Sequence, residues 1–306
     1  MATTYPTPAP ATGTDPGAAP SRRRPGRPAG GERPSAVATT ILVLGAVYCL
    51  LPVAWVLIAS SKSAGELFST FTFAPSTHLL ENIGELASYR GGLFWRWMAN
   101  TALYAGVGGL LSVVVSATAG YGLATYQFAG KKAIFNVLLA GVLVPGVVLA
   151  IPQYLLLAQV GLTNTYWSVL LPSIISPYGI YLARIYAAAS VPTDVIEAAR
   201  TDGAGELRIF ATVAVPMMLP GLVTVFLFQF VAIWNNFMLP YIMLGNDRLF
   251  PLTVGLSGLL NQGASQPAMY TSVITGALLS IIPLVALFLT LQRYWQVDLA
   301  AGAVKA

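Results

Sequence analysis

The sequence is poor in charge: Asp, Glu, Lys and Arg make up 9% of its 306 residues, whereas hydrophobic residues make up 56%. A soluble domain typically carries about 25% charged residues, because its surface must be hydrated. The mean hydropathy of +0.71 leaves little polar surface to present to water. The composition therefore excludes an ordinary soluble domain and favours a protein that lies in lipid.

Groups that commonly carry catalysis are also scarce. Cys49 is the only cysteine and His78 the only histidine, so neither an intrachain disulfide nor a cysteine-rich or multi-histidine metal site can form. No Gly-x-x-x-x-Gly-Lys sequence followed by Ser or Thr occurs, so the chain lacks that device for binding ATP. These absences argue against an intramembrane enzyme and predict no cofactor on this chain.

Charged residues lie at the edges of long apolar runs and are absent from residues 97–130, 133–183, 209–246 and 249–292. A helix needs about 20 apolar residues to cross the hydrocarbon core. The second run is long enough for two crossings, with a polar turn at residues 161–165. The spacing predicts an all-α membrane protein with six spans, at about residues 36–60, 99–126, 133–158, 166–189, 216–239 and 269–292.

Residues 1–35 are rich in Pro, Ala, Gly and Thr and carry a basic cluster, which predicts a disordered tail. A twin-arginine export signal is disfavoured, because the apolar run at residues 36–60 exceeds the roughly 7–15 residues of a signal core. Lys and Arg concentrate on one side of the predicted membrane, twelve against four. The larger set is Arg22, Arg23, Arg24, Arg27, Arg33, Lys131, Lys132, Arg184, Arg200, Arg208, Arg293 and Lys305, and the smaller is Lys62, Arg90, Arg96 and Arg248. By the positive-inside rule both termini are cytoplasmic, and the basic residues do not form a nucleic-acid face.

Residues 190–215, between the fourth and fifth predicted spans, hold four of the eleven acidic residues. The spacing of Asp194 and Glu197 resembles a capping box at a helix start. Gly203 can adopt the left-handed conformation that reverses a chain. The segment therefore predicts two short cytoplasmic helices joined at Gly203, the second leading to a span that starts at Pro216.

This segment resembles the EAA loop of ABC importer permeases. The matching residues are Glu197, Ala198, Ala199, Gly203, Val213, Val215 and Pro216. Val stands at both apolar positions where the family has Ile and Leu, a conservative departure. Further matches to maltose-type sugar permeases are Asn100-Thr101, Val144-Pro145-Gly146, Ile151-Pro152, residues 161–166, residues 234–237, residues 291–294 and residues 301–305. Asn236 replaces the Asp that is usual there, and the resemblance covers roughly residues 36–306.

The resemblance implies a permease subunit of an ATP-driven, binding-protein-dependent sugar importer in a bacterial cytoplasmic membrane. Residues 190–215 would then be a coupling loop seated on an ATPase, with Glu197 as an anchoring acceptor. Alternatively, Glu197 only caps its own helix. The implied partners are a second permease subunit, two ATPase subunits that hold ATP and Mg²⁺, an extracytoplasmic solute-binding protein and membrane lipid, with no nucleic acid.

A path for a neutral sugar needs uncharged polar groups and aromatic faces. The candidates for the translocation path are Asn100, Tyr121, Gln153, Gln229, Trp234 and Asn235. Polar residues in membrane bundles also form hydrogen bonds between helices, and Trp also gathers at the lipid headgroups, so each candidate has a structural alternative.

Two other functions compete with sugar import. A permease for another uncharged or polar solute would have the same architecture, whereas a charged solute is disfavoured because the predicted spans hold no Asp, Glu or Lys. A receptor or structural membrane protein would leave residues 190–215 unexplained.

Overall fold

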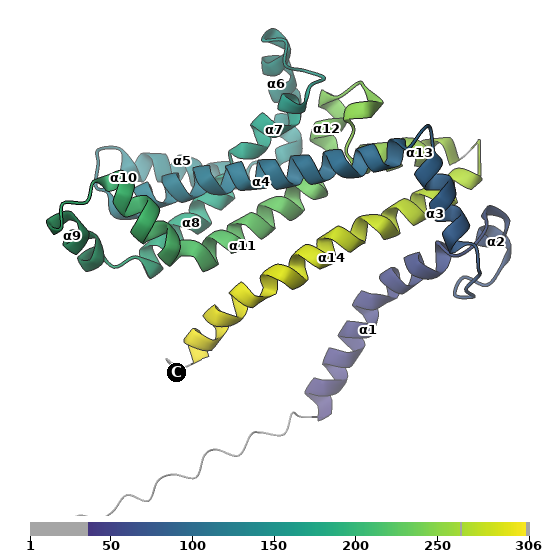
Figure 1. Cartoon of the computed structure of the whole chain (residues 1–306), viewed down its shortest axis with the longest axis horizontal. Helices are drawn as coiled ribbons and strands as arrows, with labels where there is room; N and C mark the ends of the chain where they lie inside the picture. Colours follow the sequence, from purple (N-terminus) through teal and green to yellow (C-terminus); the bar gives the residue numbers. More distant parts are fainter. Residues whose placement is uncertain (1–35, 264, 304–306) are drawn as a thin grey trace, which may run out of the picture. The chain divides into compact units, whose positions relative to one another are not determined.

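The computed structural model describes residues 36–263 and 265–303, with side chains as far as residue 294. The chain divides into two units between Leu50 and Leu51, and the predicted tail at residues 1–35 lies outside the described residues. All regular elements in the described part are helices, which confirms the all-α class (Figure 1). In chain order they are α1 (Ala36–Ala59), α2 (Ala64–Ser69), α3 (Leu79–Ser88), α4 (Leu93–Thr125), α5 (Lys131–Leu143), α6 (Gly146–Gln159), α7 (Tyr166–Ile174), α8 (Pro177–Ser190), α9 (Thr193–Thr201), α10 (Glu206–Ile209), η1 (Phe210–Ala214), α11 (Val215–Trp234), α12 (Met238–Met243), η2 (Asp247–Leu249), α13 (Leu252–Gly263) and α14 (Ala268–Ala303).

Within the described residues, 5 helical stretches are long and apolar enough to cross a membrane. They are Ala36–Ala59, Leu93–Thr125, Tyr166–Ser190, Glu206–Trp234 and Ala268–Tyr294. A sixth crossing requires α5 and α6 to act as one span, although they meet at 106°. Five of the six predicted spans therefore correspond to such stretches. The remaining one, predicted at residues 133–158, depends on whether α5 and α6 together cross the membrane.

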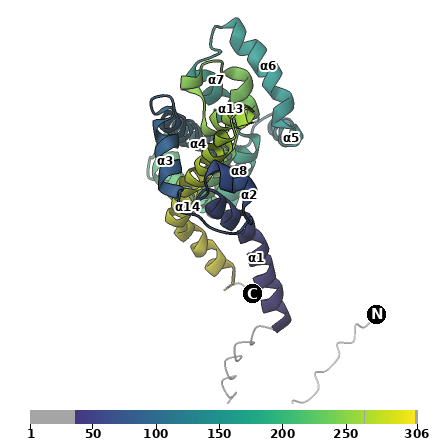
Figure 2. The same ribbon diagram turned by 90° about the vertical axis from the view of Figure 1, so that its right-hand side faces the viewer.

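The prediction of one helix over residues 133–158 is wrong. The chain leaves the helical conformation at Val144 and Pro145, whose ψ angles are 121° and 125°, and the sharp change of direction is visible in Figure 2. Proline disfavours helical geometry in the residue before it, so Val144-Pro145 ends α5. Gly146 then begins α6.

The fourth predicted span is interrupted near its middle. Ile175 and Ser176 are extended, and α8 starts at Pro177, which has no amide proton to continue the helix. The Ser176 hydroxyl accepts a hydrogen bond from the Gly179 amide at 3.0 Å and caps the new helix.

Helix α4 is central to the packing of residues 51–306, where it contacts α7, α8 and α11. It begins at Leu93, six residues before the predicted start, because Arg96 lies on the helix instead of ending it. Gly120 permits close approach to α8: a Cβ there would lie 2.6 Å from the Arg184 amide nitrogen and 2.7 Å from Ala183 Cβ. Gly120 therefore serves the packing of α4 against α8.

The fifth span differs from the prediction at both ends. It does not start at Pro216, because α10 continues through the π-helical turn η1 into α11 and forms one stretch from Glu206 to Trp234. The widened turn directly precedes Pro216, which cannot donate a backbone hydrogen bond. The helix ends at Trp234, five residues before the predicted end at 239.

Buried apolar side chains form two clusters. The first cluster includes Phe94, Trp97 and Tyr104 of α4 together with residues of α12 and α13. The second includes Tyr121 of α4 and Ile196 of α9, with residues of α8 and α11. Helix α9 therefore shares an apolar core with the C-terminal part of α4, at the same end of the helix in Figure 1.

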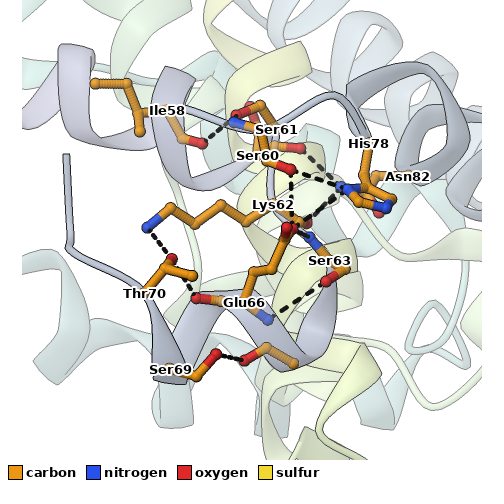
Figure 3. Close-up of polar contacts among 12 residues, drawn as sticks. Ile58, Ser60, Ser61, Lys62, Ser63, Glu66, Ser69, Thr70, His78 and Asn82 are labelled. Carbon is orange, nitrogen blue, oxygen red and sulfur yellow. Dashed lines mark hydrogen bonds and ion pairs between the residues drawn. The ribbon is translucent and has the colours of Figure 1, made fainter. Parts of the chain in front are cut away.

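A polar network organises residues 60–82 (Figure 3). Lys62 is 1% exposed, and its Nζ donates hydrogen bonds to Thr70 Oγ1 at 3.0 Å and to the Phe71 carbonyl at 2.7 Å. Asn82 Nδ2 donates to the Ser60 and Lys62 carbonyls, both at 2.8 Å. These bonds fasten the segment that follows α1 onto α3.

A capping box starts α2 in the same network: Ser63 Oγ accepts from the Glu66 amide, and Glu66 Oε2 accepts from the Ser63 amide (Figure 3). Glu66 Oε2 also accepts from Ser76 Oγ at 2.9 Å. The bonds from Ser63 and Ser76 favour the ionised carboxylate and lower the pKa of Glu66.

Candidate functional site

Helix α9 and the turn after it carry the residues that resemble the EAA loop. The helix starts after Pro192, and no side chain caps it. The predicted capping box of Asp194 and Glu197 is therefore wrong, because Asp194 lies inside the first turn. Its carboxylate there is still favourably placed near the positive end of the helix dipole.

Gly203 ends α9 in the left-handed conformation, with φ of 81°. The Ala204 amide donates to the Ala199 carbonyl and the Gly203 amide to the Arg200 carbonyl, both at 3.0 Å. This pair of bonds is a Schellman motif, which needs a residue with positive φ at the glycine position. The predicted chain reversal at Gly203 is confirmed as backbone geometry.

The outer face of α9 is open. Ile196 is buried and anchors the helix, Ala199 packs partly against the same cluster, and Glu197 and Ala198 are exposed. Within the described residues the Glu197 carboxylate makes no hydrogen bond, so it does not cap its own helix. The Thr201 hydroxyl donates to the backbone carbonyl of Glu197, at 2.9 Å. An acidic and a small residue thus face outward together.

A hydrogen-bonded cluster that was not predicted closes the turn. Arg200 Nε donates to Glu206 Oε1 at 2.6 Å, and Arg200 Nη2 donates to Glu206 Oε2 at 3.1 Å. Tyr126 Oη donates to the same Oε2 at 2.6 Å. Burial and, after it, the bond to Glu206 raise the pKa of Tyr126, and the bond to Glu206 raises the pKa of Arg200. The opposite charges on either side of Gly203 were visible in the sequence, but Tyr126 is 80 residues from Glu206.

Asn100, a path candidate, is buried and fully bonded. Its Nδ2 donates to the Arg248 carbonyl at 2.9 Å and to the Phe250 carbonyl at 3.0 Å, and its Oδ1 accepts from Tyr166 Oη at 3.1 Å. These contacts hold the segment after η2 onto α4. The Asn100 amide therefore bonds within this chain, and its place on a translocation path stays a prediction.

Three other α4 residues, missed in the sequence, hold the same segment. Trp97 Nε1 donates to the Asp247 carbonyl at 2.8 Å, and Tyr104 Oη donates to the Leu249 carbonyl at 2.9 Å. Thr101 Oγ1 accepts from the Leu252 amide at 2.7 Å. Their regular spacing on one helix face was the available signal, but the partners are backbone groups about 150 residues away.

Tyr121 and Trp234 are also buried, at 3% and 4% exposure. The Tyr121 ring packs against Phe210 at 5.2 Å between centroids, and its hydroxyl has no partner among the described residues. Trp234 stacks on Phe230 at 5.5 Å. Both rings thus lie in apolar clusters, and Trp234 is not an exposed interfacial anchor.

Gln229 compensates for the break in the fourth span. Pro177 cannot donate to the carbonyl four residues earlier, which belongs to Ser173. Gln229 Nε2 of α11 donates to that carbonyl at 3.0 Å. The side chain thus satisfies a backbone acceptor that the proline leaves free, as a membrane interior requires.

We expect Gln229→Leu to lower the free energy of unfolding by about 1–2 kcal/mol, because it leaves the Ser173 carbonyl without a donor. The measurement is thermal unfolding of the purified protein in detergent. Gln153→Leu is the matched control, since the Gln153 amide makes no hydrogen bond within the described residues. Equal losses in both variants would contradict the role given to Gln229.

Of the six path candidates, Asn235 is exposed, Gln153 and Gln229 are half-buried, and the other three are buried. Gln153 is half-buried on α6, and Asn235 is exposed at the end of α11, where its Nδ2 donates to the Val231 carbonyl at 2.9 Å. The candidates are distributed over α4, α6 and α11 and form no single site. Within the described residues no group of three or more His, Cys, Asp or Glu side chains is placed to hold a metal ion.

Comparison with known families classifies this architecture. Residues 112–296 match the family described as the binding-protein-dependent transport system inner membrane component. The chain belongs to this family. It is thus a permease component of a transport system, and the resemblance read from residues 190–215 is confirmed. Family membership also supports the multi-pass membrane location.

Two permeases and one solved structure illustrate the likeness. The chain is 32% identical to the arabinooligosaccharides transport system permease of Halalkalibacterium halodurans, over 89% of this chain and 98% of that protein. It is 28% identical to the melibiose/raffinose/stachyose import permease of Bacillus subtilis, over 88% and 96% of the two chains. A chain of a bacterial ABC transporter involved in the import of alginate superposes with a TM-score of 0.72 at 23% identity, covering 84% of this chain and 95% of that one. This last match supports the fold.

Proposed function

We propose that this permease forms half of the translocation path of an ATP-driven importer for an oligosaccharide in a bacterial cytoplasmic membrane. The observation that carries the proposal is the exposed face of α9, where Glu197 and Ala198 stand free in front of a turn fixed at Gly203. On a binding-protein-dependent permease, an exposed acidic and small pair beside a fixed turn supports docking of another protein.

The energy source in this proposal is a pair of separate ATPase subunits that hold ATP and Mg²⁺. The Glu197 carboxylate is open to basic or backbone donors of such a subunit, while Ile196 fixes α9 to the membrane helices. The bias of Lys and Arg supports a cytoplasmic position for this loop and for both termini. The outward segments then meet the solute-binding protein that the family description names.

The solute class is inferred from two sources. The permeases named above serve arabinooligosaccharides and melibiose, raffinose and stachyose. The described spans carry no acidic residue between Phe210 and Asn246, which suits a neutral solute better than a charged one. One chain supplies half of the path, so a second permease subunit supplies the other face.

The proposal is tested by purifying the tagged permease from its own membrane and identifying the subunits that accompany it. We expect an ATPase, a second permease and ATP hydrolysis that rises when a sugar-loaded binding protein is added. Isolation without any ATPase would overturn the proposal. Stimulation only by a binding protein that carries another uncharged or polar solute would overturn the oligosaccharide assignment alone.

A further inference from the structure

Helix α4 is fastened at its C-terminal end to the loop that carries α9. Tyr126, the residue that ends α4, donates to Glu206, which also binds Arg200 of α9. One turn earlier, the Tyr121 ring packs against Phe210, directly after α10. A displacement of α9 therefore acts on α4 through a hydrogen bond and a ring contact, both within one turn of the helix end.

The N-terminal end of α4 is fastened to a different segment, residues 247–252. Six hydrogen bonds join them, from or to Arg96, Trp97, Asn100, Thr101 and Tyr104. Five of the six have a backbone carbonyl of residues 247–250 as acceptor, and the sixth takes the Leu252 amide as donor. Because α4 binds backbone groups of residues 247–252, this attachment does not depend on the side chains of the segment.

The helix between these ends is suited to move as one body. It is a single helix of 33 residues without an interior proline, about 50 Å long at 1.5 Å per residue. By contrast, α1, α6, α7, α11 and α14 each contain a proline, and the chain breaks between α7 and α8. Prolines and breaks are where helices bend, so α4 is the stiffest connection between the two fastened segments.

We propose that α4 is a connecting helix that transmits displacement between the α9 loop and residues 247–252, with Tyr126 and Tyr104 as positioning residues at its two ends. The proposal rests on the proposed function, because it takes α9 to be the surface on which the ATPase acts. Energetic coupling is reciprocal: a ligand that displaces residues 247–252 must bias the α9 loop by the same free energy. The connecting helix thus gives a binding protein on one side a route to the ATPase on the other.

The test uses hydroxyl deletions that keep each ring. Tyr126→Phe removes the bond to Glu206, and Tyr104→Phe removes the bond to the Leu249 carbonyl. Tyr48→Phe is the matched control, because Tyr48 is 80% exposed. Each variant, and the Tyr126/Tyr104 double variant, is assembled with its ATPase and second permease in lipid nanodiscs. The ratio of ATP hydrolysis with and without solute-loaded binding protein is then measured.

We expect each single variant to lower this ratio about three- to tenfold, the range set by one net hydrogen bond. If one helix carries the signal, the double variant lowers the ratio by less than the product of the single effects. Amide hydrogen exchange gives a second readout: ATP binding should change protection of residues 247–252, and Tyr126→Phe should abolish that change. A merely structural hydroxyl would not alter exchange at the far end of the helix.

The proposal is overturned if the assembled variants keep the ratio of the Tyr48→Phe control, or if the two effects multiply independently. Should Tyr126→Phe fail to assemble, Glu206→Gln weakens the same bond and replaces it. Failure of the proposed function gives a different result, because the unmodified complex would then hold no ATPase or show no stimulation.

Discussion

Replacing Gly120 with alanine is expected to separate α4 from α8 and to destabilise the permease by about 1–3 kcal/mol or more. The added Cβ would lie 2.6 Å from the Arg184 amide nitrogen and 2.8 Å from the Ala183 carbonyl carbon. Both are backbone atoms, so a side-chain rotation cannot relieve the contact. Thermal unfolding in detergent and the amount of permease in the membrane measure the effect.

Gly106→Ala is the control for this prediction, because it lies on the same helix and a Cβ there would meet nothing within 4 Å. Its unfolding temperature should remain unchanged or rise slightly, since alanine favours the helix over glycine. A Gly120→Ala protein as stable as Gly106→Ala would show that α4 and α8 do not pack as closely as described.

Truncating Glu197 to alanine is expected to reduce solute uptake tenfold or more while the permease still folds. An exposed carboxylate without an intramolecular bond contributes little to its own fold, so the change should fall within about 0.5 kcal/mol of stability. Loss of one partner of a charged hydrogen-bonded pair at an interface typically costs about 2–5 kcal/mol. Uptake by cells and stability of the purified protein are measured side by side.

Glu85→Ala removes an equally exposed carboxylate from α3 and serves as the control. Normal uptake by Glu197→Ala at normal abundance would contradict a docking role for α9. Equal loss of uptake in both variants would instead point to a general effect of charge.

The sequence allowed the helical class and most spans to be predicted, because charged residues are excluded from lipid whatever the packing. Span ends were harder to place. The charge pattern predicts a span boundary at Arg96, yet Arg96 lies on α4 and donates to the Arg248 carbonyl. Helices α5 and α6 meet at 106° beside Pro145, whereas Pro152 and Pro283 remain inside helices. The presence of a proline alone therefore does not predict where a helix ends.

The candidate site divides in the same way. Gly203 could be predicted because its conformation depends on its immediate neighbours. Asn100 and Gln229 could not, because their partners lie 148 and 56 residues away, and a polar side chain in a span looks the same whether it binds a solute or a backbone carbonyl. The failed capping box at Asp194 reflects a helix start two positions earlier, with Pro192 at the N-cap.

The most direct test of the central claim is uptake by proteoliposomes that contain the permease with its second permease and ATPase subunits. Labelled oligosaccharide and its binding protein are supplied outside, and ATP or a nonhydrolysable analogue inside. The account predicts accumulation with ATP, none with the analogue, and loss of accumulation when Glu197 is replaced by alanine. Accumulation that needs no ATP, or that proceeds at the full rate with the Glu197 variant, would contradict it.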